Sequence, residues 1–126
     1  MEKKIIRTDN APAPIGPYNQ AAQFGNMLFI SGQIALDPKT GNLVQGDIKT
    51  ETMQVMRNLE AVLQQAGMDF GNVIKTSIFL MDMGQFALVN EVYGSFFADN
   101  APARETVQVS GLPKGVNVEI SMIAGK

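Results

Sequence analysis

The amino-acid sequence predicts a single α+β domain over residues 1–126, built as a mostly β-sheet structure with two helices on one face. In two segments, 47–66 and 85–97, apolar residues recur at three- and four-residue spacings, which is typical of amphipathic helices. Elsewhere, short strand-forming runs are separated by Gly, Pro and Asn turn signals. The chain has 126 residues, 45% of them hydrophobic, and its composition does not change along its length, so one core is expected.

The first third of the chain is expected to form three strands. Residues 3–8 are predicted as a short edge strand. Three prolines make residues 10–17 a loop, because they remove backbone donors and fix turns. Strands are then expected over residues 18–24 and 27–31, joined by a two-residue Gly-Asn turn into a hairpin.

The first helix, over residues 47–66, is the clearest element. Asp47 is placed to cap its N-terminus, and Gly67 is placed to end it in the left-handed conformation. The remaining elements are expected to be a strand, a helix and two strands, over residues 73–82, 85–97, 104–109 and 116–124.

One sheet face is expected to remain without helices. Because strand side chains alternate, Arg104 and Thr106 are assigned to this open face, and Val107 is assigned to the core side. The open face is then expected to carry a mixed polar set: Ser77, Arg104, Thr106, Glu119 and Ser121. By the same alternation, apolar residues such as Phe79 and Ile123 are also assigned to the open face. Because exposed apolar residues favour cover by another subunit, we expect an oligomer.

The residue types that are absent limit the available chemistry. The chain has no Cys, which excludes disulfides, a thiolate nucleophile and thiolate metal sites. It has no His, so a Ser-His-Asp triad is excluded and the commonest zinc ligand is missing. Phosphate-binding glycine loops and metal-ligand spacings are also absent, so no metal or cofactor is expected.

Charge and hydropathy limit the partners and the location. A net charge of −2 without a basic stripe argues against nucleic acid binding. Residues 1–7 are charged and lack the apolar region of a signal peptide, and no apolar run is long enough to span a bilayer. We therefore expect a cytoplasmic protein without membrane association.

Arg104 is the main candidate for substrate binding. It follows Pro102 at the start of a predicted strand, where a pocket can open. Its guanidinium is a planar fork of donors that matches a carboxylate with two hydrogen bonds. The alternative is a structural ion pair, with Glu119 as a candidate partner, which spacing alone favours because such pairs are common.

Glu119 interrupts an apolar strand between Val118 and Ile120. It is a solvated residue, a partner for Arg104, or a carboxylate that positions or deprotonates water. Burial would raise its pKa and a neighbouring arginine would lower it, so both directions stay open at this point.

Four further positions are weaker candidates. Tyr18 is either an amphipathic strand residue or a hydroxyl that closes a pocket. Ser31 and Gly32 end a predicted strand, and Gly32 would let a ligand approach the backbone closely. Asn90 is more simply read as an exposed residue of the second helix.

The same stretches resemble the Rid family, also called YjgF, and its RidA branch of enamine/imine deaminases. The matching motifs include Ile15-Gly16-Pro17-Tyr18-Asn19-Gln20-Ala21 and Pro102-Ala103-Arg104. The matches run in order along nearly the whole chain, over residues 15–21, 29–34, 37–41, 58–67, 73–76, 89–97, 102–104, 112–113 and 118–120.

This resemblance implies a chorismate-mutase-like (YjgF-like) fold and a homotrimer with pockets at the subunit interfaces. It also implies metal- and cofactor-independent hydrolysis of 2-aminoacrylate and 2-aminocrotonate, through their 2-imino acid tautomers, to 2-oxo acids and ammonia. PLP-dependent dehydratases make these reactive compounds. The alternative is a non-catalytic 2-oxo-acid-binding sensor or regulatory protein of amino-acid metabolism.

The resemblance also implies roles for individual residues. Arg104 matches the arginine that binds the substrate carboxylate, and Glu119 matches the glutamate assigned to hold the attacking water. The other matching substrate-binding positions are Tyr18, Ser31, Gly32 and Asn90, and Thr106 is also assigned to substrate binding. The chain departs from the family pattern at Thr106, where Cys is common, and at Ala101, where an aromatic residue is usual, which puts rate and substrate range in doubt more than fold.

Overall fold

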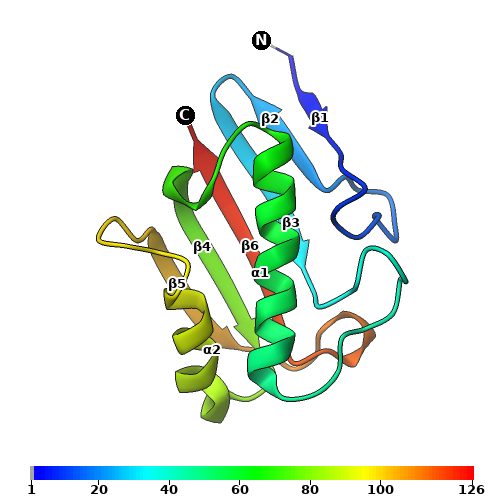
Figure 1. The fold of residues 1–126 in the computed structure, drawn as a ribbon, viewed down its shortest axis with the longest axis vertical. Helices are drawn as coiled ribbons and strands as arrows, with labels where there is room; N and C mark the ends of the chain where they lie inside the picture. The colour runs from blue at the N-terminus through cyan, green and yellow to red at the C-terminus, as the bar shows by residue number, and fades with distance from the viewer. Residues whose placement is uncertain (1) are drawn as a thin grey trace.

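A six-stranded sheet forms one layer of the computed structural model, which describes residues 2–126 (Figure 1). The strands follow the order β1-β2-β3-β6-β4-β5, in which β4 and β5 are parallel and the other neighbours antiparallel. The strands are β1 (Lys4–Ile6), β2 (Ala21–Phe24), β3 (Met27–Gln33), β4 (Val73–Leu80), β5 (Ala103–Gln108) and β6 (Val118–Gly125).

Two α-helices, α1 (Ile48–Gln65) and α2 (Phe86–Gly94), lie side by side on one face of this sheet (Figure 1). This arrangement confirms the predicted α+β fold with two helices on one face. Short 3-10 helices interrupt the connections at η1 (Phe70–Asn72), η2 (Met83–Gln85) and η3 (Pro113–Gly115). Within residues 2–126, no helix combines the length and the apolar character that crossing a membrane requires.

α1 forms where its apolar spacing predicts it. Asp47 caps the helix, since its Oδ1 accepts a hydrogen bond from the Thr50 amide at 2.8 Å. Gly67 follows the helix with a φ of +73°, a conformation that favours glycine. The apolar stripe packs on the sheet to form the core, with Val55, Met56, Leu59, Val62 and Leu63 of α1 fully buried beside Leu28, Ile78 and Ile120 of the strands.

α2 ends earlier than the predicted 85–97. Its last residue is Gly94, and the chain then leaves the helix through tight turns, in which Ser95 Oγ donates to the Val92 carbonyl at 2.6 Å. Phe96 and Phe97 still pack against the core, where both rings lie against Phe70.

The hairpin of β2 and β3 is shifted along the chain from its predicted position. β2 begins at Ala21 instead of residue 18, because the Tyr18 amide donates to the Gly16 carbonyl at 2.8 Å and keeps this stretch in the preceding loop. β3 extends to Gln33 instead of residue 31, through an irregularity in its pairing with β6.

The predicted placement of Arg104 and Thr106 on the open sheet face is wrong. The parallel register pairs Arg104 with Thr76 and Thr106 with Ile78, and paired residues share a face. Thr76 and Ile78 are buried on the side of the sheet that the helices cover. The alternation of side chains along β5 separates its two faces. Only the pairing of β5 with β4 shows which of these faces lies under the helices.

The open face instead carries Glu105 and Val107 from β5, which pair with Ser77 and Phe79 of β4. Val107 is therefore 42% exposed rather than part of the core. Glu105 accepts hydrogen bonds from Lys75, at 2.8 Å, and from Ser77, so the ion pair of this face does not involve Arg104.

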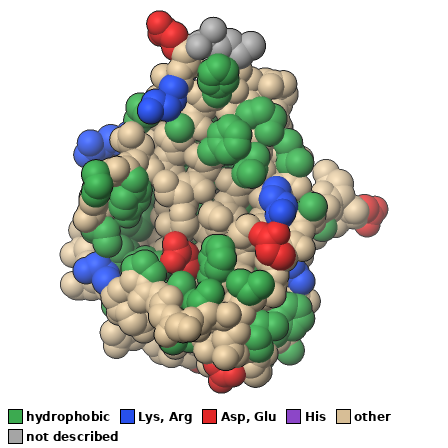
Figure 2. Space-filling view, turned by 180° about the vertical axis from the view of Figure 1, so that it is seen from behind, with side chains coloured by type: hydrophobic (Ala, Val, Ile, Leu, Met, Phe, Trp, Pro, Cys, Tyr) green, Lys and Arg blue, Asp and Glu red, His purple; other side chains and the backbone are tan. Residues whose placement is uncertain are grey.

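The view from behind shows hydrophobic side chains in several groups on this open side of the sheet, with charged and other side chains between them (Figure 2). Phe29 of β3 pairs with Ile123 of β6 here, and Phe29 is 48% exposed. A large aromatic side chain with this exposure on an extended apolar face is typical of a surface that another subunit covers.

Candidate functional site

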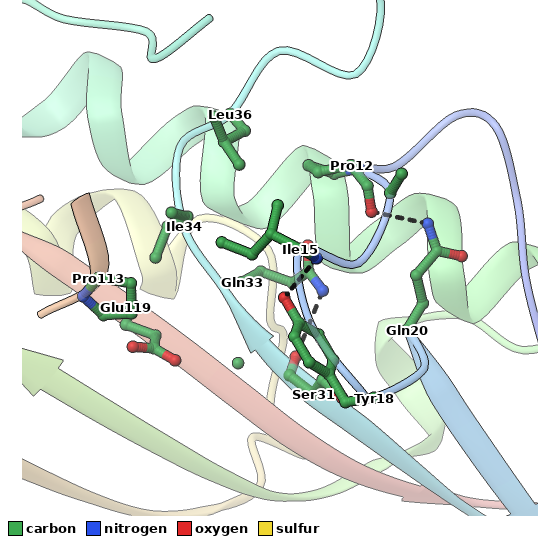
Figure 3. A pocket seen from close by; sticks show the side chains of 12 residues that line it. Pro12, Ile15, Tyr18, Gln20, Ser31, Gln33, Ile34, Leu36, Pro113 and Glu119 are labelled. Carbon is green, nitrogen blue, oxygen red and sulfur yellow. Dashed lines mark hydrogen bonds between the residues drawn. The ribbon is translucent and has the colours of Figure 1, made fainter. Parts of the chain in front are cut away.

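A cavity of about 390 Å³ opens beside the end of β3 (Figure 3). Four of the predicted site residues border it: Tyr18, Ser31, Gly32 and Glu119. The remaining wall is mostly apolar and consists of Pro12, Ala13, Ile15, Ile34, Leu36 and Pro113, with Gln20 and Gln33. Its size and its few polar groups are typical of a site for a small molecule.

The close approach of Gly32 and Glu119 shapes the floor of this cavity. The pairing of β3 with β6 shifts between Ile30 and Gln33, so Ser31 and Gly32 bulge out of the regular ladder. A Cβ atom on Gly32 would overlap the Glu119 carboxylate and would lie 2.9 Å from its Cδ atom. The Glu119 carboxylate therefore occupies space that only glycine leaves free.

Glu119 is a half-buried acid whose carboxylate has no partner in the part of the chain that the structure describes. Burial raises the pKa of the Glu119 carboxyl above its ordinary value, because the charged form loses solvation. Within residues 2–126, the Glu119 carboxylate makes no hydrogen bond and no ion pair. Its oxygens are therefore available to water or to a ligand.

The hydroxyls of Tyr18 and Ser31 differ in how strongly they are hydrogen-bonded within the protein. Ser31 Oγ donates to the Asn19 carbonyl at 2.6 Å, which ties β3 to the loop that carries Tyr18. The Tyr18 hydroxyl accepts a long hydrogen bond of 3.4 Å from the Ile15 amide, so its own proton stays available for a ligand (Figure 3).

Arg104 lies on the other face of the sheet and makes a second cluster with α2. Its Nη1 donates to Asn90 Oδ1 at 2.6 Å, and its Cζ atom lies 5.2 Å and 5.5 Å from the ring centroids of Tyr93 and Phe86. Asn90 is thus a specific partner of Arg104 rather than only an exposed helical residue. Among residues 2–126, Arg104 has no carboxylate partner, so part of its donor fork remains open to an anion.

Thr106 completes this second cluster. It lies two residues along β5 from Arg104 and points to the same side of the sheet. Its Oγ1 atom is buried without a hydrogen-bond partner in the described part of the chain, which is uncommon for a buried hydroxyl.

One chain therefore contains two separate clusters of predicted site residues. Tyr18, Ser31, Gly32 and Glu119 border the cavity, whereas Arg104, Asn90 and Thr106 lie on the opposite face of the sheet, at its β5 edge. No group of acidic side chains in residues 2–126 is arranged to hold a metal ion.

The sequence reasoning missed the aromatic platform beneath Arg104. Tyr93 lies in the core and Phe86 packs against it, and the rings of both residues also support the guanidinium. The signal was present in the spacing, because Phe86, Asn90 and Tyr93 lie four and three residues apart on one helix face. Gln20, which lines the cavity, was also not singled out.

Known families and proteins resemble this chain over nearly its whole length. A family model described as endoribonuclease L-PSP matches residues 8–126. A RutC family protein from Pyrococcus horikoshii is 54% identical over 124 residues, with 98% of each chain covered. A mouse protein named 2-iminobutanoate/2-iminopropanoate deaminase is 48% identical over 122 residues, which cover 97% of this chain and 90% of the mouse protein.

Solved structures agree with these matches. A Rid family protein of unknown function from Yersinia pestis has a TM-score of 0.96 and 48% identity, covering 99% of this chain and 100% of its own. TdcF from E. coli, solved with bound serine, has a TM-score of 0.92 and 42% identity, covering 98% of each chain. With the family model matching almost all of the sequence and close relatives in both comparisons, the chain belongs to the Rid (YjgF) family.

Proposed function

We propose that this protein is a RidA-type deaminase that hydrolyses 2-iminopropanoate and 2-iminobutanoate, with their enamine tautomers, to 2-oxo acids and ammonia. The observation that carries the proposal is a pair of oppositely charged groups without an ion-pair partner in residues 2–126, Glu119 in the cavity and Arg104 on its aromatic platform. The mouse deaminase and the serine bound to TdcF add support, because both names point to small amino-acid-derived ligands.

The proposal includes a homotrimer, with the Arg104 cluster of one protomer facing the Glu119 cavity of the next. Within one protomer these groups lie on opposite faces of the sheet, so a shared substrate requires a second chain. The apolar open face with its exposed Phe29 gives such an assembly a surface to bury. We place the reaction in the cytoplasm, beside the PLP-dependent dehydratases that make these compounds.

The chemistry needs orientation more than a strong nucleophile. In the protonated imine, C2 is already electrophilic, and Arg104 fixes the substrate carboxylate through its fork of donors. Water attacks C2 while the C=N π electrons move to nitrogen, and Glu119 takes a proton from the water. Glu119 then returns this proton to the nitrogen, the C–N bond breaks, and ammonia leaves as the hydroxyl oxygen forms the C=O bond. The hydroxyl proton passes to the Glu119 carboxylate and from there to the released ammonia, which leaves as ammonium.

The raised pKa of Glu119 suits this exchange. A carboxylate with a raised pKa is a stronger base than an ordinary glutamate, so it accepts a proton from water more readily, and its acid form then returns that proton to nitrogen. The Tyr18 hydroxyl and the Gly32 backbone, which border the same cavity, are placed to contact the substrate.

The test is to incubate the protein with a PLP-dependent dehydratase and serine or threonine, and to follow the decay of the imine. The wild type should accelerate decay, and Arg104→Ala should raise KM and lower kcat/KM by about a hundredfold, the loss of one charge-assisted carboxylate contact worth roughly 3 kcal/mol. If imine decay matches buffer alone, the deaminase proposal is wrong. Tight binding of 2-oxobutanoate without turnover would instead favour the sensor or regulatory alternative.

A further inference from the structure

One wall of the cavity consists of a loop without helix or strand. Pro12, Ala13 and Ile15 of this loop line the cavity, and Tyr18 follows it directly (Figure 3). Three prolines remove backbone donors from residues 10–17, so the loop has little capacity to fix its own position by backbone hydrogen bonds. Its position must be fixed by groups outside the loop.

A single buried side chain holds the first part of this loop together with the residues before it. Gln20 is 2% exposed, and its Oε1 accepts a hydrogen bond from the Thr8 amide at 2.7 Å. Its Nε2 donates to the carbonyls of Thr8, Ala11 and Pro12 at 2.9, 3.2 and 2.9 Å. Across residues 2–126, no other hydrogen bond joins residues 8–12 to a different part of the chain.

We propose that Gln20 is a positioning residue, whose carboxamide holds the loop so that its apolar wall stays against the substrate beside Glu119. Its kinetic consequence rests on the proposed deaminase function. Gln20 acts through Pro12 and Ile15 and does not need to contact the reacting atoms. Losing the carboxamide would leave the Thr8 amide and the loop carbonyls without protein partners, so the loop would move toward water to satisfy them.

Asn72 provides a matched control. Its carboxamide also bridges two backbone segments, since Nδ2 donates to the Gly125 carbonyl at 3.1 Å and Oδ1 accepts from the Asp69 amide at 3.0 Å. Gly125 ends β6, whereas Glu119 lies near the start of that strand, and Asn72 does not line the cavity. Asn72→Leu therefore removes two hydrogen bonds of the same kind, against four for Gln20, without touching the loop.

The experiment compares Gln20→Met with Asn72→Leu. Gln20→Met keeps the length of the side chain but makes none of its hydrogen bonds, so KM should rise roughly tenfold, equivalent to about 1.4 kcal/mol of lost binding, while kcat changes much less. In methyl NMR spectra the Ile15 signal should shift or broaden, while Ile34 on the other side of the cavity keeps its position. Asn72→Leu should lower Tm and leave KM and the Ile15 signal unchanged.

A second variant covers the case in which Gln20→Met does not fold. Ile15 is 59% exposed, so Ile15→Ala should fold normally and should reproduce the rise in KM by removing the wall directly. The proposal is overturned if Gln20→Met leaves KM and the Ile15 signal unchanged, if Asn72→Leu raises KM equally, or if Ile15→Ala has no effect on KM. If the wild type does not turn over imines, the deaminase function fails, and the Ile15 signal of Gln20→Met still decides whether Gln20 positions the loop.

Discussion

At the residue scale, Gly32 and Glu119 pack closely together at the cavity, because the Glu119 carboxylate lies where a Cβ atom of residue 32 would be. Gly32 does not have a left-handed φ, so its backbone tolerates alanine and only the contact with Glu119 opposes it. We predict that Gly32→Ala folds but lowers kcat at least about tenfold, because the displaced carboxylate no longer holds water in line with the imine. Steady-state kinetics with a circular dichroism control test this, and a wild-type kcat would contradict it.

The burial of Glu119 has a consequence for stability. Its pKa is raised in the folded protein, so the folded state binds this proton more tightly than the unfolded state does. The free energy of unfolding contributed by Glu119 therefore falls as pH rises from the ordinary Glu value of about 4.3 through the raised value.

We therefore expect Glu119→Gln, which removes the buried charge, to raise the Tm of a single protomer at pH 7, where no Arg104 from a neighbouring protomer faces Glu119. Its advantage should disappear at a pH below the ordinary Glu value, where both proteins are neutral at this position. Thermal unfolding at the two pH values measures this difference. An equal effect of the substitution at both pH values would show that burial of the charge is not the cause.

At the element scale, α2 acts as a platform for β5, since it supplies both the rings beneath Arg104 and the amide that accepts from it. Tyr93 is the central residue of this platform. Its hydroxyl donates to Thr76 Oγ1 at 3.1 Å, and burial raises the pKa of Tyr93 so that the hydroxyl stays neutral.

Two substitutions of Tyr93 distinguish the contribution of its ring from the contribution of its hydroxyl. Tyr93→Phe should lower the free energy of unfolding by about 1 kcal/mol, the value of one hydrogen bond, and should leave KM near wild type because the ring remains. Tyr93→Leu should raise KM severalfold, because the guanidinium loses the ring that holds it. Denaturant unfolding and kinetics on both variants test this, and equal KM values for the two would contradict a platform role.

The elements also show which parts of the fold can be predicted from sequence. α1 was predicted nearly to the residue, because its apolar stripe, its Asp47 cap and its terminal Gly67 are all local signals. The start of β2 was missed, because Gln20 bonds to residues 8–12 through tertiary contacts that the local sequence does not show. The predicted sheet face of Arg104 was wrong, because this face depends on how β5 pairs with β4, and these two strands are distant in sequence.

The candidate site was predicted in part for the same reason. Tyr18, Ser31, Gly32 and Glu119 do border one cavity. These four residues and Arg104 lie on opposite faces of the sheet because of the pairing of its strands, which no sequence motif shows. The contact of Phe86 and Tyr93 with Arg104 was not predicted, because the same helix face packs against both the core and the guanidinium.

At the scale of the whole molecule, the open sheet face and the split site point to the same requirement for a partner protomer. A protomer alone presents a cavity with one acid, Glu119, on one side of the sheet and Arg104 on the other, so neither cluster contains both groups that the proposed reaction uses. We therefore expect purified protein to sediment as a trimer. Phe29→Glu on the exposed open face should weaken assembly and lose activity together, although Phe29 does not line the cavity.

The most direct measurement of this central claim mixes two inactive variants, Arg104→Ala and Glu119→Gln, by joint unfolding and reassembly. If each site takes Arg104 from one protomer and Glu119 from the next, random reassembly of an equal mixture should restore about a quarter of wild-type turnover, because one interface in four combines both intact residues. A mixture that stays as inactive as its two components would show that each site draws both residues from one chain, which contradicts the account.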